Sequence, residues 1–285
     1  MAFGHFAVMF LSDRVKKIPP SGIRVFFDLV MSSKGIISLG VGEPDFLTPW
    51  NIRDEAIYRL EKGYTTYTSN KGLLELREEI SKYLKRQFSI EYSSNEVLIT
   101  NGVSEAVDLA MRTFINPGDE VILPEPSYVC YRPLIELCDG VTVPLDTSES
   151  NFVPTLDNIA SKITTKTKAL ILSFPNNPTG QSMALNDLQH IADLALEKNI
   201  LIITDEIYAD LSFKPFKSIA TQKKLKNQLI YLNGFSKAHS MTGWRVGYVC
   251  ASEGYIEAMN KIHQYSSLCA PTMSQYAAIE HVKIH

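Results

Sequence analysis

Two ionisable side chains follow apolar runs that have the pattern of buried strands, and both could take part in catalysis. Asp205 follows the run ILIIT, and Lys237 ends the run QLIYLNGFSK. A lysine amine on a rigid backbone can bind a carbonyl compound covalently, and a carboxylate among apolar residues requires a cationic or hydrogen-bonding partner. The alternatives are a surface lysine for Lys237 and a helix N-cap for Asp205.

Two further polar side chains also lie shortly after apolar runs in the sequence. Asn177 lies in the turn NNPTG, which follows another apolar run, and Tyr208 comes three residues after Asp205. An amide and a phenol can both hydrogen-bond an oxygen on a bound ring. Asn177 could equally belong to a plain turn, and Tyr208 could be ordinary amphipathic packing.

A possible anion site lies between the run EVLIT and the next helical pattern. Gly102, Val103 and Ser104 stand there, and free backbone N–H groups at a helix start bind anions. Ser236 and Arg245 could complete such a cup. Ser104 could also be an N-cap, which is compatible with an anion site and with a plain helix start.

Tyr128 opens the expected helix 128–138 and could stack on a bound ring; the alternative is core packing. A lysine amine, an acid for a ring nitrogen, donors for a ring oxygen, a stacking face and an anion cup are together what pyridoxal 5′-phosphate requires.

The elements that would position these residues alternate between strands and helices. The expected strands are 96–100, 120–126, 141–145, 168–174, 200–206, 228–237 and 245–251. The expected helices are 51–62, 72–87, 104–115, 128–138, 185–198 and a last long one from near Glu253. Such alternation predicts an α/β fold with a mostly parallel sheet covered on both faces, and ligands bind such sheets at the carboxyl ends of the strands.

Composition narrows the classes of function. The chain has 285 residues, 45% hydrophobic and 21% charged, with a formal net charge of −3. This charge gives no electrostatic case for nucleic acid, and no stretch has the length of a membrane helix. The four cysteines form no C-x-x-C pair, and no metal motif is present, which favours free thiols in the cytoplasm.

The combined motifs resemble those of the fold-type I aminotransferases that depend on pyridoxal phosphate, in their class I/II (aspartate/aromatic) branch. The strings that carry the resemblance are SLGVGEPDF, YTSNKGLLELR, NGVSEA, PEPSY, PNNPTG, TDEIYADL and GFSKAHSMTGWRVGY, and they extend over nearly the whole chain. PSGIRVFFDLV and KIHQYSSLCAP further resemble the bacterial aminotransferase-A group, linked to aromatic amino acids and N-acetyl-diaminopimelate. The resemblance implies that family's large domain, a mostly parallel mixed sheet covered by helices on both faces.

The resemblance also implies a role for each matching residue. Lys237 would be the Schiff-base lysine and proton shuttle, Asp205 would pair with the pyridine nitrogen, and Tyr128 would stack on the ring. Asn177 and Tyr208 would bond the ring oxygen. The phosphate would be held by Gly102, Val103, Ser104, Ser236 and Arg245. Substrate contacts would come from Gly42, Asn177 and Tyr67, with Tyr67 reaching the neighbouring site of a homodimer.

The expected organisation is an N-terminal arm over residues 1–45 and a cofactor-binding large domain over 46–285. Family members continue by on the order of a hundred residues, a domain's worth, which form a small domain with the arginine that clamps the substrate carboxylate. That domain would lie outside this sequence.

The predicted activity is a ping-pong transfer of an amino group between an L-amino acid and a 2-oxo acid. A C–S β-lyase on the same scaffold and a cofactor-binding fragment without turnover remain alternatives. A nucleotide-binding oxidoreductase is discounted, because Gly40-x-Gly42 is followed by neither a third glycine nor a helix start.

Overall fold

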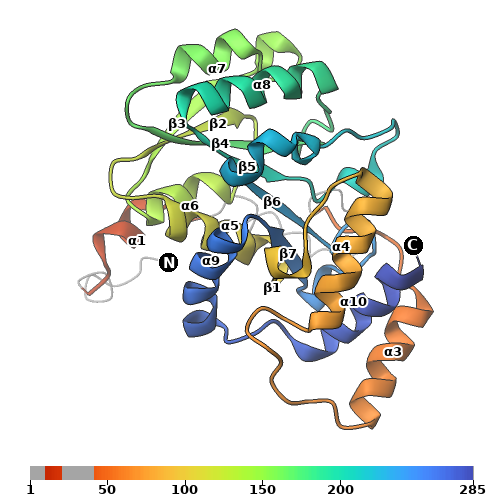
Figure 1. Ribbon diagram of the computed structural model, residues 1–285. Helices are drawn as coiled ribbons and strands as arrows, with labels where there is room; N and C mark the ends of the chain where they lie inside the picture. The colour runs from red at the N-terminus through yellow and green to blue at the C-terminus, as the bar shows by residue number, and fades with distance from the viewer. Residues whose placement is uncertain (1–9, 21–41, 285) are drawn as a thin grey trace, which may run out of the picture.

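The computed structural model describes residues 10–20 and 42–284, and these form a single seven-stranded mixed sheet with helices on both faces (Figure 1). The strand order is β1-β7-β6-β5-β4-β2-β3. The strands are β1 (Val97–Thr100), β2 (Glu120–Glu125), β3 (Val141–Asp146), β4 (Thr167–Ser173), β5 (Leu201–Asp205), β6 (Leu229–Gly234) and β7 (Gly247–Cys250). The expected mostly parallel sheet is confirmed, and β7 is its one antiparallel strand in the described part of the chain.

The helices lie where hydrophobic residues recur at helical spacing. They are α1 (Asp13–Lys17), α3 (Trp50–Glu61), α4 (Leu74–Phe88), α5 (Gly102–Phe114), α6 (Tyr131–Leu137), α7 (Leu156–Lys162), α8 (Leu185–Lys198), α9 (Glu253–Ser266) and α10 (Thr272–Ile284). Six short 3₁₀ turns complete the set: η1 (Ser94–Glu96), η2 (Ser148–Ser150), η3 (Ala209–Leu211), η4 (Ile219–Thr221), η5 (Lys223–Gln228) and η6 (Thr242–Trp244). Within the described ranges, every helix falls short of the length and apolarity that a membrane crossing needs.

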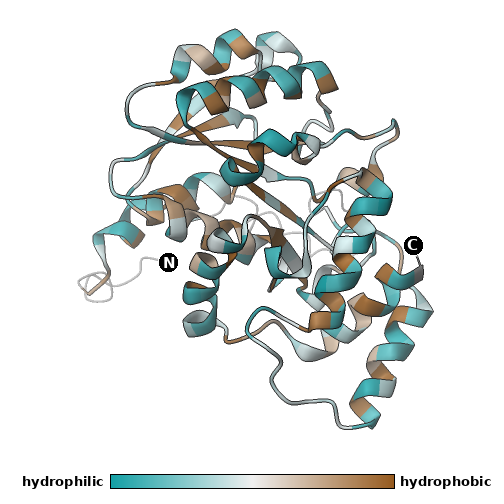
Figure 2. Ribbon diagram, in the orientation of Figure 1, coloured by the Kyte–Doolittle hydropathy of each residue, from teal (hydrophilic) through white to brown (hydrophobic). Residues whose placement is uncertain are grey.

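Alternate residues of each strand pack on opposite faces of the sheet. On β6, Ile230 and Leu232 join a cluster with α5, α6 and α9, whereas Tyr231 joins a cluster with α3, α4 and α10. A third cluster, around Ile202, contains residues of α7 and α8. Apolar residues dominate the central strands and alternate with polar residues along the helices (Figure 2). The two-sided covering explains why the strands read as nearly continuous apolar runs.

Several expected boundaries are wrong, and four of them concern the expected site residues. The helix predicted from residue 128 begins at Tyr131, and the helix predicted from residue 104 begins at Gly102, so Ser104 lies in its first turn and is not the N-cap. The strand predicted to reach Lys237 ends at Gly234, and the strand predicted from Arg245 begins at Gly247. These two strands contact closely at their glycines, because a Cβ on Gly234 would lie 2.9 Å from the Cα of Gly247, and beyond that point the chains leave the sheet.

The sequence also gave no sign of α7, and the last long helix is two helices, α9 and α10. Most of the expected arm, residues 1–45, lies outside the described residues, as does most of the PSGIRVFFDLV motif. The division into arm and large domain therefore stays a prediction.

The parallel topology brings the ends of distant strands to one edge of the sheet. Ser173, the last residue of β4, pairs in register with Asp205, the last of β5, and β6 ends beside them at Gly234. Because β7 runs antiparallel between β6 and β1, its first residue Gly247 lies at the same edge, opposite Thr100 of β1. This edge is where the predicted site residues should meet.

Packing of α8 against the sheet gives a direct test of the core. Leu188 is 4% exposed, whereas Leu185 on the same helix is 38% exposed. We expect Leu188→Ala to lower the free energy of unfolding by about 2 to 5 kcal/mol, because it leaves a cavity in the core. In urea denaturation the matched Leu185→Ala should cost less than about 1 kcal/mol. Equal losses for the two variants would contradict the packing described.

Candidate active site

A cavity of about 780 Å³ opens at the carboxyl edge of the sheet. It gathers ten of the twelve side chains and glycines expected from the sequence: Gly42, Val103, Ser104, Tyr128, Asn177, Asp205, Tyr208, Ser236, Lys237 and Arg245. They come from six different connections after or before strands. The structure therefore brings together residues that lie up to about two hundred positions apart in sequence, as the fold class requires.

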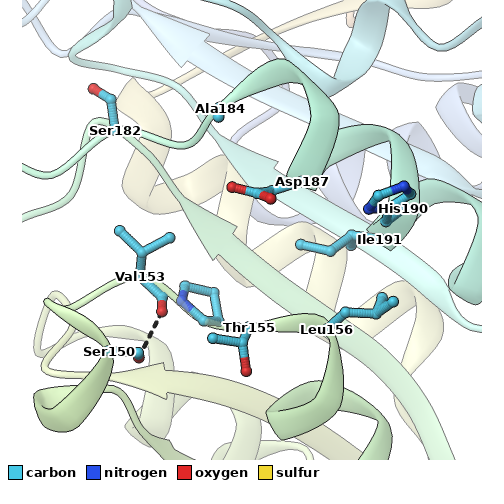
Figure 3. Close-up of a pocket in the computed structure, with 10 residues that line it drawn as sticks. Ser150, Val153, Thr155, Leu156, Ser182, Ala184, Asp187, His190 and Ile191 are labelled. Carbon is cyan, nitrogen blue, oxygen red and sulfur yellow. Dashed lines mark hydrogen bonds between the residues drawn. The ribbon is translucent and has the colours of Figure 1, made fainter.

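A second hollow, of about 400 Å³, lies between α7 and α8 and has a different character (Figure 3). Asp187, His190 and Ser182 line it, and all three are exposed. Its lining among the described residues includes no lysine or arginine, so it offers neither an amine for covalent chemistry nor a cation for a phosphate. The cavity at the sheet edge is the candidate active site.

Asp205 is a buried carboxylate with two hydrogen bonds that hold it in place. It is 5% exposed at the end of β5. Its Oδ1 accepts the backbone N–H of Ile207 at 3.1 Å, and its Oδ2 accepts the Tyr131 hydroxyl at 2.8 Å. Burial raises the pKa of Asp205 to about 6, while the hydrogen bonds and the charge of Lys237 oppose that rise. The carboxyl group can thus ionise at neutral pH inside the protein.

Lys237 lies three residues beyond β6, with its side chain in the cavity. Its Nζ donates to the carbonyl oxygen of Gly42 at 2.6 Å. Burial lowers the pKa of Lys237, the carboxylate of Glu43 opposes this change, and the positive charge of Arg245 adds to it. A lysine whose pKa is lowered is more readily neutral, and the neutral amine is the nucleophile.

The start of α5 and Arg245 form a cup suited to an anion. Gly102 begins the helix with φ +74°, and Arg245 follows η6 with φ +52°, so both have the left-handed backbone. Arg245 donates from Nη1 to the carbonyl of Thr242 at 3.1 Å and from Nη2 to that of Asn101 at 3.4 Å. A Cβ on Gly102 would lie 2.7 Å from Arg245 Nη2, so only glycine lets the guanidinium come this close to the helix N-terminus.

Asn177 and Tyr208 come together on another side of the cavity. Asn177 Nδ2 donates to the Tyr208 hydroxyl at 3.4 Å. The turn itself is held by Asn176, whose Oδ1 accepts from the backbone N–H of Thr179 at 3.1 Å and from its hydroxyl at 2.8 Å. Because Asn176 holds the turn, the side chain of Asn177 is left available to a ligand. The structure therefore assigns the turn to Asn176, and the ligand role expected for Asn177 stays a prediction.

Two of the twelve expected residues, Gly102 and Tyr67, are not among the residues that line the cavity. Tyr128 lines the cavity from the turn before α6 and is 37% exposed, so the core-packing alternative for it is wrong. Tyr67 is 80% exposed and is not among the lining residues of the cavity. Its expected role concerns a neighbouring subunit and stays a prediction.

Sequence reasoning missed Tyr131, which reaches Asp205 from α6. It also gave no role to Glu43 and Cys130, which line the cavity, or to Glu206, the neighbour of Asp205. The only trace of Tyr131 in the sequence is its position three residues after Tyr128. Its contact with Asp205, 74 residues away, depends on how α6 packs against β2, β3 and α5.

Glu206 points to the other side of β5 and is 2% exposed. Its Oε1 accepts the hydroxyls of Ser218 at 2.9 Å and Thr204 at 3.1 Å, and burial raises its pKa to about 8. The two adjacent carboxyl groups thus differ in pKa. At a pH between about 6 and about 8, the balance favours the neutral form of Glu206 and the ionised form of Asp205. Among the described residues, no group of three or more His, Cys, Asp or Glu could hold a metal ion.

Comparison with known proteins gives one consistent result. The family model described as aminotransferase class I and II matches residues 34–283. The putative aminotransferase YugH of Bacillus subtilis (strain 168) is 47% identical over 96% of this chain and 72% of its own length. The probable N-acetyl-LL-diaminopimelate aminotransferase of the same organism is 41% identical over 95% of this chain and 69% of its own length.

The solved structure of aspartate aminotransferase from Thermus thermophilus with maleate aligns with a TM-score of 0.92 at 32% identity. The alignment covers 96% of this chain and 73% of that one. The backbone fold of this chain is therefore shared with that enzyme over nearly the whole length of the chain.

The two buried carboxyl groups predict distinct effects of pH on stability. Because the pKa of Asp205 in the folded protein, about 6, lies above the ordinary value of 3.8, the folded state holds the proton more tightly and stability falls as pH rises through this window. We expect Asp205→Asn to remove this fall and to stabilise the cofactor-free protein above pH 6 by up to about 3 kcal/mol.

Glu206→Gln is the matched comparison. It should remove a fall in stability that extends from pH 4.5, the ordinary pKa of a glutamate, up to about pH 8. Urea denaturation of the two variants and the wild type at several pH values measures both effects. If the free energy of unfolding depends on pH in the same way in Asp205→Asn and in the wild type, the buried, ionised carboxylate is contradicted.

Proposed function

The chain belongs to the class I and II aminotransferases, enzymes that move an amino group between an amino acid and a 2-oxo acid with pyridoxal 5′-phosphate, and on that premise we propose that Lys237 is the amine that binds the cofactor. The observation that carries the proposal is the meeting of Lys237, Asp205 and Arg245 in one cavity. They supply an amine, an anion and a cation to a ligand with an aldehyde, a basic ring nitrogen and a phosphate.

The phosphate end of the cofactor fits the cup at the start of α5. Backbone N–H groups of Gly102, Val103 and Ser104 would donate to it, and the Ser104 and Ser236 hydroxyls and the Arg245 guanidinium would complete the set. The absence of a side chain on Gly102 supports this assignment, since it is what allows Arg245 to approach the same point as the N–H groups.

The ring end fits the remaining lining residues. Asp205 would pair with the ring nitrogen and keep it protonated, because a buried carboxylate is stabilised by a cationic partner. Asn177 and Tyr208 would hydrogen-bond the ring oxygen, and Tyr128 would lie against the ring face. These three side chains and Asp205 approach from three separate connections, after β2, β4 and β5, which suits a flat ligand held on several edges.

The bound cofactor supplies an electron sink for the α carbon of the amino acid. Lys237 Nζ would move the proton to and from that carbon, and its lowered pKa supports this role because a neutral amine can accept a proton at neutral pH. The backbone of Gly42, which already accepts a hydrogen bond from Lys237, would lie beside the substrate, and Asn177 would touch its carboxylate.

We propose that two copies of the chain form a homodimer in which Tyr67 reaches the neighbouring site. Four large side chains near the start of the described region support a partner surface, because all are more than half exposed: Phe46, Leu47, Trp50 and Tyr67. We also propose a cytoplasmic location, which suits four cysteines that are all free thiols.

The amino donor is proposed to be an L-amino acid of one of three classes. The relatives carry names that refer to aspartate, aromatic amino acids and N-acetyl-LL-diaminopimelate, so these are the donors to test first. Product analysis separates transfer from lyase chemistry. A new amino acid and a 2-oxo acid mean transfer, whereas pyruvate with a thiol from a sulfur amino acid means a C–S β-lyase.

Replacement of the cofactor lysine tests the assignment directly. We expect Lys237→Arg to lower the rate of amino transfer by about a thousandfold or more, because arginine keeps the charge but cannot move the proton. Lys214→Arg, remote from the cavity lining, is the control and should keep the wild-type rate. Retention of activity by Lys237→Arg would refute the assignment.

Mixing two inactive variants tests the shared site. If Tyr67 serves the neighbouring subunit, a heterodimer of Lys237→Arg and Tyr67→Phe chains contains one site with both residues intact. Refolding an equal mixture should then restore about a quarter of the wild-type activity, since half the dimers are mixed and each has one good site. If the mixture stays as inactive as its components, Tyr67 does not act across the interface.

A further inference from the structure

The hydroxyl of Tyr131 lies at the point where the ends of β4 and β5 meet. Tyr131 is 2% exposed, and its oxygen lies 2.8 Å from Asp205 Oδ2 and 3.0 Å from Ser173 Oγ. Ser173 and Asp205 are register partners on neighbouring strands, and Ser173 is itself 6% exposed. The Tyr131 oxygen therefore links Ser173 and Asp205 through two hydrogen bonds at the wall of the cavity.

The chemistry of the groups sets the direction of these hydrogen bonds. The phenol has one hydrogen, and the carboxylate is an acceptor only, so the Tyr131 hydrogen goes to Asp205. The Ser173 hydroxyl can then donate to the Tyr131 oxygen. A hydrogen bond to a charged acceptor is about twice as strong as one between neutral groups, and the second bond polarises the first.

These contacts leave the carboxylate of Asp205 with a fixed orientation. Oδ1 is tied to the backbone N–H of Ile207 and Oδ2 to Tyr131, which lie on different segments. Rotation of the carboxylate would break one or both of these hydrogen bonds. The remaining lone pairs are therefore directed at a constant place in the cavity.

We propose that Tyr131, oriented by Ser173, is the positioning residue that holds Asp205 ionised and aimed at the ring nitrogen of the cofactor. The inference rests on the proposed function, because it concerns the same ligand. Tyr131 itself lines the cavity, but the role assigned to it is exerted through Asp205.

The charged and titratable groups around Asp205 do not substitute for this contact. Those whose charge interacts with it are Lys237, Cys130, Tyr128, Tyr208 and Glu206. Of these only Lys237 is a cation, and its nitrogen is bonded to Gly42. Tyr131 is thus the one side chain in the described residues that donates directly to the carboxylate.

The test compares two ligands on the cofactor-free full chain: pyridoxal 5′-phosphate and an analogue in which C–H replaces the ring nitrogen. We expect Tyr131→Phe to weaken binding of the cofactor about tenfold, the equivalent of one pKa unit, and to leave binding of the analogue within about twofold. The pH at which cofactor affinity is half lost should also rise above the wild-type value, since the carboxyl group of Asp205 then protonates more easily.

Two further variants keep the test decisive. Ser173→Ala should lower the ratio of cofactor affinity to analogue affinity, as Tyr131→Phe does, but by a smaller factor. If Tyr131→Phe does not fold, Ser173→Ala alone tests the role of the Tyr131 hydroxyl. Tyr231→Phe is the matched control, because Tyr231 is a fully buried tyrosine whose hydroxyl bonds Asn233 on the other face of the sheet. It should leave the ratio unchanged.

Equal losses for cofactor and analogue would overturn the inference, because they would mean that Tyr131 acts by packing alone. An unchanged cofactor affinity in Tyr131→Phe, or an unchanged ratio in Ser173→Ala, would overturn it too. In those cases the wild type still binds the cofactor and the proposed function stands. A wild-type chain that binds neither ligand would instead overturn the proposed function and this inference together.

Discussion

The carboxylate of Asp205, buried at the carboxyl end of the central strand β5, is the constraint on which the site depends. An ion in that position is unfavourable unless other groups stabilise it. The structure supplies the Tyr131 hydroxyl, the Ile207 N–H and the charge of Lys237, and each comes from a different connection. The arrangement still leaves the pKa of Asp205 raised, so a cationic ring nitrogen beside it would stabilise its charge.

The backbone at the sheet edge also brings the cationic side chain of Arg245 close to the N-terminus of α5. The antiparallel strand β7 lies between β1 and β6, so the chain that leaves Lys237 returns beside the start of α5. A Cβ on Gly247 would lie 2.8 Å from the carbonyl carbon of Gly102 and the nitrogen of Val103. The closeness of these segments depends on glycine, and the left-handed turn at Arg245 then directs its guanidinium into the cup.

The sequence predicted the features that depend on the local pattern of residues, which are the strands and the polar residues at their ends. All seven strands were predicted, because each is a short run rich in apolar residues, and Asp205 was recognised as an acid at the end of one. Motifs known from a family added Lys237, Asn177 and Arg245. It could not predict that Arg245 leaves the strand for a left-handed turn, or that α6 begins three residues late, since contacts with distant segments decide both. Tyr131 was missed for the same reason, because nothing near it in the sequence distinguishes it from an ordinary core tyrosine.

The most direct measurement is the identity of the residue that binds the cofactor. The purified chain is incubated with pyridoxal 5′-phosphate, reduced with borohydride so that the linkage becomes permanent, and digested for peptide mapping by mass spectrometry. The account predicts that the label is found on Lys237, because it is the lysine in the cavity that also contains Asp205 and Arg245. A label on another lysine, or no label, would contradict it.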